Sequence, residues 1–411
     1  MISPHAPATV VVVGAGPAGC ATSLLLARAG IAVTLVEAEP RLSSPFRGEA
    51  LMPSGFEALE RLGLPCLPAA VPQRSLKGWR VLVEGQHLLE VPEPIGPGPA
   101  CTLVGQEELL ATLLEQASES PCFTRRQGVR VTGLQRQGSR IGGVTLADGA
   151  SLAADLVVAC DGRASMLRRQ AELPLLLAPP QHEVLWFLLA AEAVAEIRDW
   201  LGGTFLTVLG AGNGFALFET AANENLRLGW LCRPGDDLDL TPGEWLERLA
   251  QTCEAPLATW LRQLPTTALQ GPLRVPIQVG LAKRWHQDGF LLLGDGAHPL
   301  SPVRAQGLNM ALRDAIVAAE ELVPALRQGG GAELAAALPK IERRRQPELR
   351  RIQALQAAES SSGELLRSQG WLRQVLAAQP NLFRPLITQI WLGRQRQLRQ
   401  GLPLGSRPGV P

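Results

Sequence analysis

The chain has 411 residues, a formal net charge of +1 and 46% hydrophobic residues. This length predicts two domains with a sizeable core, and the near-neutral charge gives no reason to expect a nucleic-acid partner. The seven cysteines form no Cys-x-x-Cys pair and no Cys/His cluster, which argues against a disulfide framework and against a metal site. Because the sequence shows no signal peptide and no membrane-spanning apolar run, we expect a cytoplasmic protein without a transmembrane segment.

The N-terminal segment predicts a nucleotide-binding unit. The apolar run Thr9–Val13 predicts a buried strand, a helix is expected next, and residues 31–36 predict a second strand that is followed by Glu37. The turn before the helix reads G-x-G-x-x-G. In this motif Gly14 makes the tight turn, Gly16 lets the backbone approach a pyrophosphate, and Gly19 lets the helix pack close to the strand. The helix N-terminus can bind phosphate, and the Glu37 carboxylate can accept hydrogen bonds from a ribose. This fingerprint alone does not separate NAD from FAD.

Two later apolar strands also end in turns that contain glycine. Residues 155–160 lead into Asp161-Gly162, and residues 290–293 lead into Gly294-Asp295. The carboxyl ends of parallel strands gather at one edge of a doubly wound sheet, where ligands bind. We therefore expect both turns to lie beside the first glycine turn.

Short strands predominate in the middle of the chain. A meander is expected over residues 128–153, a hairpin from 78–83 and 87–91, and an antiparallel sheet from 184–190, 204–209, 215–219 and 226–232. In the last of these runs, one face carries Leu226, Leu228, Trp230 and Cys232. This face either forms the core beneath the sheet or lines an apolar ligand pocket.

Helical patterns fill much of the remaining chain. Ser54 is expected to cap a helix that ends near Leu62, and Thr241 to cap a helix that reaches Leu264. Other helices are expected over residues 106–116, 341–358, 363–377 and 382–398, whereas 401–411 are expected to be loose. The C-terminal helices either pack on the rest of the protein or make peripheral contact with a membrane surface.

In this order along the chain, the glycine turns resemble those of the FAD-dependent aromatic-hydroxylase-like monooxygenases, single-component flavoproteins of the para-hydroxybenzoate-hydroxylase type, over residues 10–358. The resemblance implies an α/β fold. In it, a three-layer, Rossmann-like FAD-binding domain carries an inserted, mainly antiparallel β-sheet substrate domain and C-terminal helices. The FAD-binding domain is expected over residues 1–74, 100–180 and 276–330, the substrate domain over 75–99 and 181–275, and the helical region over 331–411.

The resemblance also implies the cofactor contacts. In the family, the first glycine turn and the acid after it hold the ADP part of FAD, and an arginine and a glutamine contact its diphosphate region. The Gly-Asp turn contacts the ribityl chain, and the start of a later helix cradles the isoalloxazine. The D-G-x-x-S-x-x-R motif, Asp161 to Arg168 here, is implicated in binding both FAD and the nicotinamide cofactor. Matched to this sequence, the expected FAD-binding residues are Gly14, Gly16, Pro17, Ala18, Gly19, Glu37, Ala38, Arg47, Gln106, Val129, Asp161, Gly162, Gly294, Asp295, Gly307, Leu308 and Asn309.

The reaction implied by the resemblance uses NAD(P)H and O₂. A flavin C4a-hydroperoxide would hydroxylate or epoxidise an apolar small-molecule substrate of aromatic, quinone-like, isoprenoid or polyketide-like type. His298 is a candidate acid or base, or a structural histidine. Arg304 and Ala305 stand where relatives usually have glycines. Arg304 could bind an acidic substrate group, stabilise a reduced flavin anion, or point to solvent.

Other functions use related chains. A flavin-dependent halogenase would need a lysine near the flavin, for which Lys77 is available, but the Trp-x-Trp-x-Ile-Pro segment of halogenases is absent from this sequence. A reductase of prenyl double bonds shares the cofactor domain and is distinguished by oxygen uptake. An escort protein that carries a hydrophobic ligand would bind no FAD, and the acids Glu37, Asp161 and Asp295 argue against it. The oligomeric state is left open.

Overall fold

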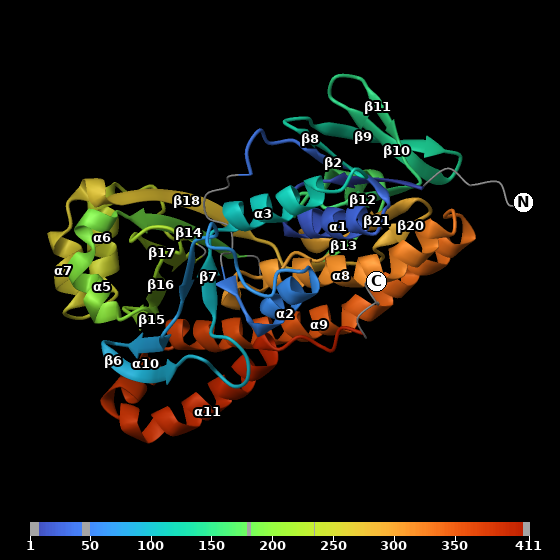
Figure 1. The fold of residues 1–411 in the computed structure, drawn as a ribbon. Coiled ribbons are helices and arrows are strands. Elements are labelled where there is room, and N and C mark those ends of the chain that lie inside the picture. The colour runs from blue at the N-terminus through green and yellow to red at the C-terminus, as the bar shows by residue number, and fades with distance from the viewer. Residues whose placement is uncertain (1–7, 43–49, 179–181, 234, 406–411) are drawn as a thin grey trace, which may run out of the picture.

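The computed structural model describes residues 8–42, 50–178, 182–233 and 235–405 (Figure 1). A mainly parallel sheet lies at one end of the molecule and a mainly antiparallel sheet at the other, and the long helix α9 runs past both. Among the described residues, no helix combines the length and the apolar character needed to cross a bilayer.

The mainly parallel sheet brings the predicted turns together. Its strand order is β20-β21-β12-β1-β2-β8, in which β20 is antiparallel to β21 and the other neighbours are parallel. The strands are β1 (Thr9–Val13), β2 (Ala32–Glu37), β8 (Phe123–Gln127), β12 (Leu156–Ala159), β20 (His286–Gln287) and β21 (Phe290–Leu292). Because β1, β12 and β21 are neighbours, the turns that follow them share one edge of the sheet, as predicted.

This sheet is the middle of three layers (Figure 1). One face packs on helices α1 (Pro17–Arg28), α3 (Gln106–Ser118) and α8 (Gln306–Arg327), with α2 (Pro53–Arg61) beside α8. The other face packs on the predicted meander of β9 (Val131–Gln137), β10 (Arg140–Leu146) and β11 (Ser151–Ala153). Side-chain alternation along β1 accounts for both contacts, since Val10 and Val12 pack on the helices and Val11 and Val13 on the meander.

The second sheet has the order β18-β14-β17-β16-β15-β5-β6. All its neighbours are antiparallel except β5 and β15, so the predicted hairpin of β5 and β6 extends the predicted antiparallel sheet. The strands are β5 (Gly78–Val83), β6 (Gln86–Pro92), β14 (His182–Leu189), β15 (Thr204–Gly210), β16 (Asn213–Glu219), β17 (Leu226–Leu231) and β18 (Leu269–Ile277).

The face of β17 that carries Leu228 and Trp230 forms core. Both side chains are buried in one cluster with residues of α5 (Ala195–Leu201), α6 (Pro242–Gln251) and α7 (Leu257–Gln263). The alternative expectation, that this face lines a ligand pocket, is therefore wrong. Residues on the opposite face of the sheet belong to a second apolar cluster, which includes Met52 and Ala305.

Short elements connect the two main sheets. One small sheet joins β3 (Ala50–Leu51), β7 (Thr102–Val104) and β4 (Gln73–Ser75), and another joins β13 (Leu175–Leu177) to β19 (Gly280–Ala282). Helix α4 (Met166–Gln170) follows the turn after β12. Because β4 leads into the hairpin and β7, which follows it, pairs with both β3 and β4, the chain crosses between the two sheets here by paired strands.

Two expected helix boundaries need correction. Ser54 does not cap α2, because Pro53 takes the first helical position and leaves Met52 as the N-cap, and the Ser54 side chain is buried. Thr241 does cap α6 in a capping box with Glu244, but the helix ends at Gln251 and α7 is separate, since Pro256 interrupts the pattern.

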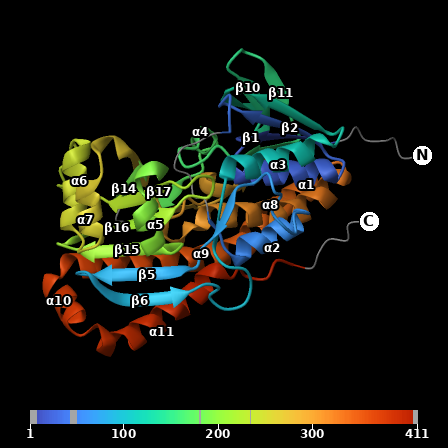
Figure 2. The same cartoon turned by 60° about the vertical axis from the view of Figure 1, so that its left-hand side comes forward.

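The C-terminal helices also differ from the prediction. Residues 332–368 form one continuous helix, α9 (Ala332–Ser368), although Pro339 and Pro347 lie inside it. Helices α10 (Gly370–Ala378) and α11 (Pro380–Arg399) then turn back beneath the hairpin (Figure 2). Packing of α9 on α8 and on both sheets outweighs the low helix propensity of proline.

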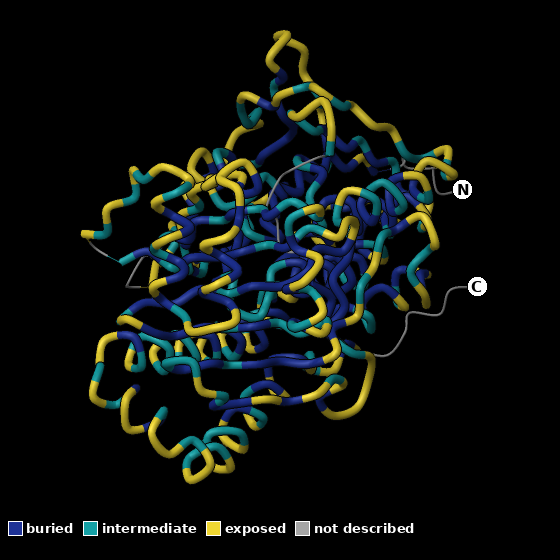
Figure 3. Tube along the Cα trace, turned by 90° about the vertical axis from the view of Figure 1, so that its left-hand side faces the viewer, coloured by how far each residue is buried: buried dark blue, intermediate teal, exposed yellow. Residues whose placement is uncertain are grey.

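Burial follows this arrangement (Figure 3). Buried residues concentrate where the sheets run, and the outer turns of α10 and α11 are exposed. The segment after α11 is held as far as it is described, because Arg313 donates to the Leu402 carbonyl and Leu402 N donates to Glu348 at 2.8 Å. The expectation of a loose end is therefore wrong for residues 401–405, and residues 406–411 lie outside the described part.

Helix α11 is fastened to the hairpin by a buried ion pair, which gives a stability prediction. Arg399 and Glu93 pair with side chains only 2% and 1% exposed. Arg399→Met would leave the Glu93 carboxylate buried without its cation, and we expect the free energy of unfolding to fall by about 3–5 kcal/mol. Urea denaturation measures this, with Arg396→Met, at an exposed position of the same helix, as the matched control. Equal stability of the two variants would contradict the role of this pair.

Candidate functional site

The first glycine turn has the geometry of a phosphate-binding loop. Gly14 has φ +101°, and a side chain there would meet the carbonyl oxygen of Cys160 at 2.4 Å. A side chain on Gly19 would lie 1.9 Å from the Gly14 oxygen, so only glycine lets α1 pack this closely. A side chain on Gly16 would meet nothing within 4 Å, because this residue faces open space at the start of α1. Among the described residues, none caps this helix end with its side chain, which leaves its N–H groups available.

Glu37 stands at the end of β2, as predicted. Its carboxylate accepts hydrogen bonds from Ala15 N at 2.6 Å and from Glu39 N at 2.8 Å. The acid therefore lies directly against the glycine turn. Val129 N donates to the Glu37 carbonyl at 2.9 Å, so Val129 and Ala38 border the same end of the strand.

The turn after β12 is held by its own motif. The Asp161 carboxylate accepts from Ser165 Oγ at 2.5 Å and from Leu167 N at 3.1 Å, while Ser165 caps α4. Arg168 donates to the carbonyl of Gly296 at 2.8 Å. The D-G-x-x-S-x-x-R pattern thus ties the turn after β12 to the turn after β21, and Gly162, with φ +79°, faces open space.

The Gly-Asp turn presents Asp295 beside the first residues of α8. Asp295 Oδ2 accepts from Arg163 Nε at 2.8 Å, and both side chains are about one-third exposed. The Asp295 carboxylate also lies near Gly307, since a side chain on Gly307 would reach within 4.0 Å of Asp295 Oδ1. Asp295 and Gly307 are therefore neighbours.

His298 is a structural residue. Its ring is 1% exposed, its Nε2 lies 2.5 Å from Asp314 Oδ2, and it packs on Trp285 with ring centroids 5.1 Å apart. Of the two alternatives that the sequence left open for His298, this burial and the contact with Asp314 favour the structural histidine.

Asp314, on α8, is the centre of a buried network that the sequence did not single out. It accepts from Gly294 N at 3.0 Å and from Arg345 Nε at 2.7 Å, in addition to its contact with His298. Burial raises the pKa of Asp314, but the charges of His298 and Arg345 outweigh burial, and the pKa lies below its ordinary value. One carboxylate thereby fixes the Gly-Asp turn to α8 and α9.

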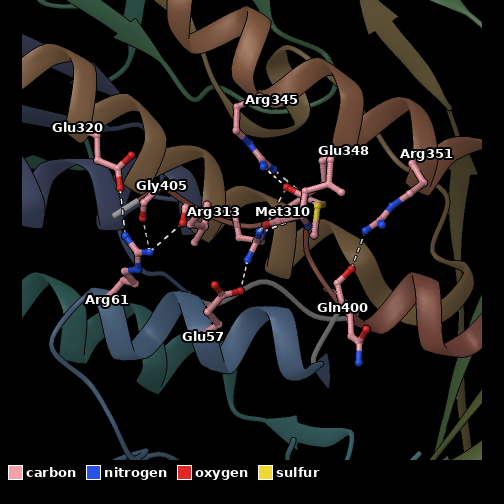
Figure 4. A network of polar contacts seen from close by, with 12 residues as sticks. Glu57, Arg61, Met310, Arg313, Glu320, Arg345, Glu348, Arg351, Gln400 and Gly405 are labelled. Atoms are coloured by element: carbon pink, nitrogen blue, oxygen red, sulfur yellow. Dashed lines mark hydrogen bonds and ion pairs between the residues drawn. The ribbon is translucent and has the colours of Figure 1, made fainter. Parts of the chain in front are cut away.

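The network continues toward α2 and the end of the chain (Figure 4). Glu348 pairs with both Arg345 and Arg313, and Arg313 Nη1 contacts Glu57 at 2.5 Å. Burial raises the pKa of Glu348, but Arg345 and Arg313 hold it below the usual range. Arg61 and Glu320 form a second branch in the same view. Glu57 of α2 thus belongs to this network.

The loop before α8 has an unusual backbone. Arg304 and Ala305 have φ of +59° and +48°, values that glycine adopts more readily, at the positions where the sequence departs from the expected glycines. Gln356 on α9 donates to the carbonyls of Ser301 and Val303 at 2.9 and 2.7 Å. Asn309 donates to Ala305 O at 2.9 Å and accepts from Met52 N at 2.8 Å. The loop is therefore held from both sides.

Arg304 does not point to solvent. Its side chain is 10% exposed and pairs with Glu359 on α9, with Nε 2.9 Å from Oε1. Its guanidinium lies 4.7 Å from the ring centre of Trp79 and 5.1 Å from that of Trp391. Glu359, Gln356 and Trp391 were missed from the sequence, since helical periodicity does not indicate which face of α9 or α11 meets this loop.

An aromatic row lines the face of the second sheet that turns toward this loop. We use this name for Trp79, Phe205, Phe218 and Trp186. The first three lie on the neighbouring strands β5, β15 and β16, and Trp186 lies on β14, on the other side of β17. Ring centroids are 5.0 Å apart between Trp79 and Phe205, 4.9 Å between Phe205 and Phe218, and 6.3 Å between Phe218 and Trp186. The row belongs to one apolar cluster with Met52 from the α2 region and Ala305 from the loop.

Two further predicted residues lie on helices. Gln106 is the half-buried first residue of α3, whose N-cap is Gly105, and Leu308 is buried in α8. A cleft of about 130 Å³ lies between Gly105 and the loop after β16. Ala221, which lines this cleft, belongs to the same apolar cluster as the aromatic row. Arg47 lies outside the described residues.

A glycine-rich turn at the carboxyl edge of a parallel sheet, before a helix whose first N–H groups are available, is the arrangement of a dinucleotide-binding protein. A family model described as "FAD binding domain" matches residues 7–350. The chain belongs to this family, and it is an FAD-dependent oxidoreductase of the flavoprotein monooxygenases.

Relatives match along most of the chain. It is 32% identical over 399 residues to 6-methylpretetramide 4-monooxygenase of Streptomyces rimosus, with 94% of this chain and 92% of that protein covered. It is 29% identical over 365 residues to ubiquinone hydroxylase UbiL of Rhodospirillum rubrum, covering 83% and 78%. In fold it resembles p-nitrophenol 4-monooxygenase PnpA of Pseudomonas putida, with a TM-score of 0.76, 19% identity, and 97% and 100% of the chains covered.

The two glycines of the first turn should respond differently to alanine. Gly16 has φ −74° and faces open space, so Gly16→Ala should keep the fold and weaken FAD binding by about tenfold or more. Gly19→Ala places a carbon against the Gly14 oxygen and should lower the free energy of unfolding by about 1–3 kcal/mol or more. Flavin titration and urea denaturation measure both, and wild-type FAD affinity in Gly16→Ala would refute the assignment.

The depressed pKa of Asp314 predicts acid lability. Its stabilising contribution is fully present above the unfolded-state pKa of about 3.9 and is lost as the pH falls through the lower folded-state value. Asp314→Asn should be less stable at pH 7 and should lose less of its remaining stability between about pH 5 and pH 3 than the wild type. Urea midpoints across this range measure the slope, with exposed Asp199→Asn as the control. Parallel slopes for Asp314→Asn and wild type would be evidence against the network.

Proposed function

We propose that this protein is an NAD(P)H-dependent FAD monooxygenase that hydroxylates a bulky, apolar aromatic substrate with O₂. The observation that carries the proposal is the aromatic row, which packs on Ala305 of the loop before α8 and so borders the expected flavin position. Planar rings bind well on such a surface, because stacked and edge-on aromatic contacts add to apolar burial. A quinone-like or isoprenoid substrate is the neighbouring possibility, with epoxidation as the corresponding reaction for an isolated double bond.

The residues present fit FAD. The pyrophosphate would bind at the open side of Gly16 and at the N-terminus of α1. The Glu37 carboxylate would give up its hydrogen bond from the backbone N–H of Ala15 and accept hydrogen bonds from the ribose instead. Asp295 would meet the ribityl chain, and the backbone of residues 307–309 would support the isoalloxazine. Gln106, at the start of α3, would approach the diphosphate from the other side, together with Arg47.

Bound FAD would take a hydride from NAD(P)H and activate O₂. The chain itself would supply position and shelter. The aromatic row would hold the substrate ring, and the side chains of Met52 and Ala305 would exclude water from the space beside it. The loop of residues 301–305, fixed by Gln356 and Asn309, would keep the reacting faces in register. No side chain is required as a nucleophile.

The names of relatives support this reaction class. One is named for 4-monooxygenation of 6-methylpretetramide and another for hydroxylation of ubiquinone, and both cover most of this chain. The open side of Gly16 and the acids beside it speak against an escort protein that binds no FAD. A prenyl reductase remains the alternative that an apolar site also fits.

Isotope incorporation separates these functions. Purified holoenzyme is given NADPH, ¹⁸O₂ and a panel of polycyclic phenols, hydroquinones and prenylated quinones, and products are examined by mass spectrometry. We expect one ¹⁸O atom in an aromatic product. Substrate-dependent consumption of NADPH that gives a reduced product without ¹⁸O would establish the reductase instead.

Asp295 gives a test of the cofactor site. Asp295→Ala removes a carboxylate that would accept hydrogen bonds from the ribityl chain, and we expect the dissociation constant of FAD to rise about tenfold or more while the fold is retained. Fluorescence titration of the apoprotein with FAD measures this, and Asp288→Ala, at a more exposed acid on the preceding turn, is the control. Unchanged FAD affinity would remove the role given to Asp295.

A further inference from the structure

The guanidinium of Arg304 borders the proposed substrate site. It lies over Trp79, the first member of the aromatic row, at 4.7 Å from the ring centre, while Trp391 of α11 covers it at 5.1 Å. Its backbone is in the left-handed region on the loop that leads into α8. A cation therefore lies between the row and the loop, in a place that is 10% exposed.

The charge of this cation is already matched. Glu359 on α9 accepts from Arg304 through Nε and Nη2 and is 13% exposed. Its second oxygen accepts from Gln395 Nε2 of α11 at 3.1 Å. Both carboxylate oxygens thus have partners, and the carboxylate is held beside the guanidinium by α9, which carries it, and by Gln395 of α11. In this low-dielectric setting the pair presents no net charge to the aromatic row.

We infer that Glu359 is a specificity-determining residue that restricts the site to uncharged aromatic substrates; this rests on the proposed function. A ligand carboxylate near Trp79 would have to compete with Glu359 for the guanidinium and would lie close to a second negative charge. The ion pair of Arg304 and Glu359 would not weaken the binding of a neutral phenol or quinone, because such a ligand contacts only the aromatic row. Arg304 alone would select for acids, and Glu359 reverses that selection.

Replacing Glu359 by glutamine tests the inference without turnover. Holoenzyme is titrated with 2-naphthol and with 3-hydroxy-2-naphthoate, and binding is followed by the change in flavin absorbance. Wild type should bind the naphthoate at least about tenfold more weakly than the naphthol. Glu359→Gln should bind the naphthoate at least about tenfold more tightly than wild type does, because the guanidinium then pairs with the ligand. Equal naphthoate affinity in the two proteins, including no binding by either, overturns the inference.

Further variants identify the cause. In the double variant Arg304→Gln/Glu359→Gln the gained naphthoate affinity should disappear, whereas a gain that persists would mean that Arg304 is not the ligand's partner and would overturn the inference. Glu333→Gln removes the same charge from an exposed position in the first turn of α9 and should leave both affinities unchanged.

A variant that retains Glu359 covers the case in which Glu359→Gln does not fold. Arg304→Gln leaves the carboxylate of Glu359 without its cation, although Gln395 still donates to it, and should lower the ratio of naphthoate to naphthol affinity by about tenfold relative to wild type. An unchanged ratio overturns the inference. These titrations are independent of catalysis, so missing ¹⁸O incorporation with altered ligand preference would reject the proposed reaction and leave the specificity role intact.

Discussion

The buried carboxylate of Asp314 holds together the parts of this protein that must meet at the cofactor. It contacts the backbone of the Gly-Asp turn through Gly294, the ring of His298 and the guanidinium of Arg345. These groups belong to the turn after β21 and to α9, while Asp314 itself lies on α8. A buried charge of this kind is tolerated only with partners, so the turn and both helices are fixed relative to one another.

Other side chains of α9 make similar polar contacts. Glu348 pairs with two arginines, Gln356 bonds the loop before α8, and Glu359 pairs with Arg304. These three side chains lie on one helix and together connect the cofactor edge, the loop and the aromatic row. Helix α9 is therefore the element that relates the two sheets, which explains why it remains continuous through two prolines.

The sequence predicted what local patterns determine. The strand and glycine pattern around Gly14, Gly16 and Gly19 needs only neighbours in sequence, and the parallel sheet followed from repeated strand-to-glycine turns. The pairing of Arg304 with Glu359 and of Asp314 with Arg345 could not be predicted, because Glu359 and Arg345 lie 55 and 31 residues away on a helix whose periodicity fits several faces. Ser54 was assigned wrongly because Pro53 competed for the helix start. For the face that carries Trp230, the sequence left core and pocket open, because a strand pattern does not indicate which helices cover it.

We expect these turns to hold a redox-active flavin beside the aromatic row. The most direct measurement is the visible absorption spectrum of the purified protein, recorded before and after NADPH is added under air. We expect flavin absorbance that bleaches with NADPH and recovers as oxygen reoxidises the cofactor. A colourless protein that cannot be reconstituted with FAD would contradict it.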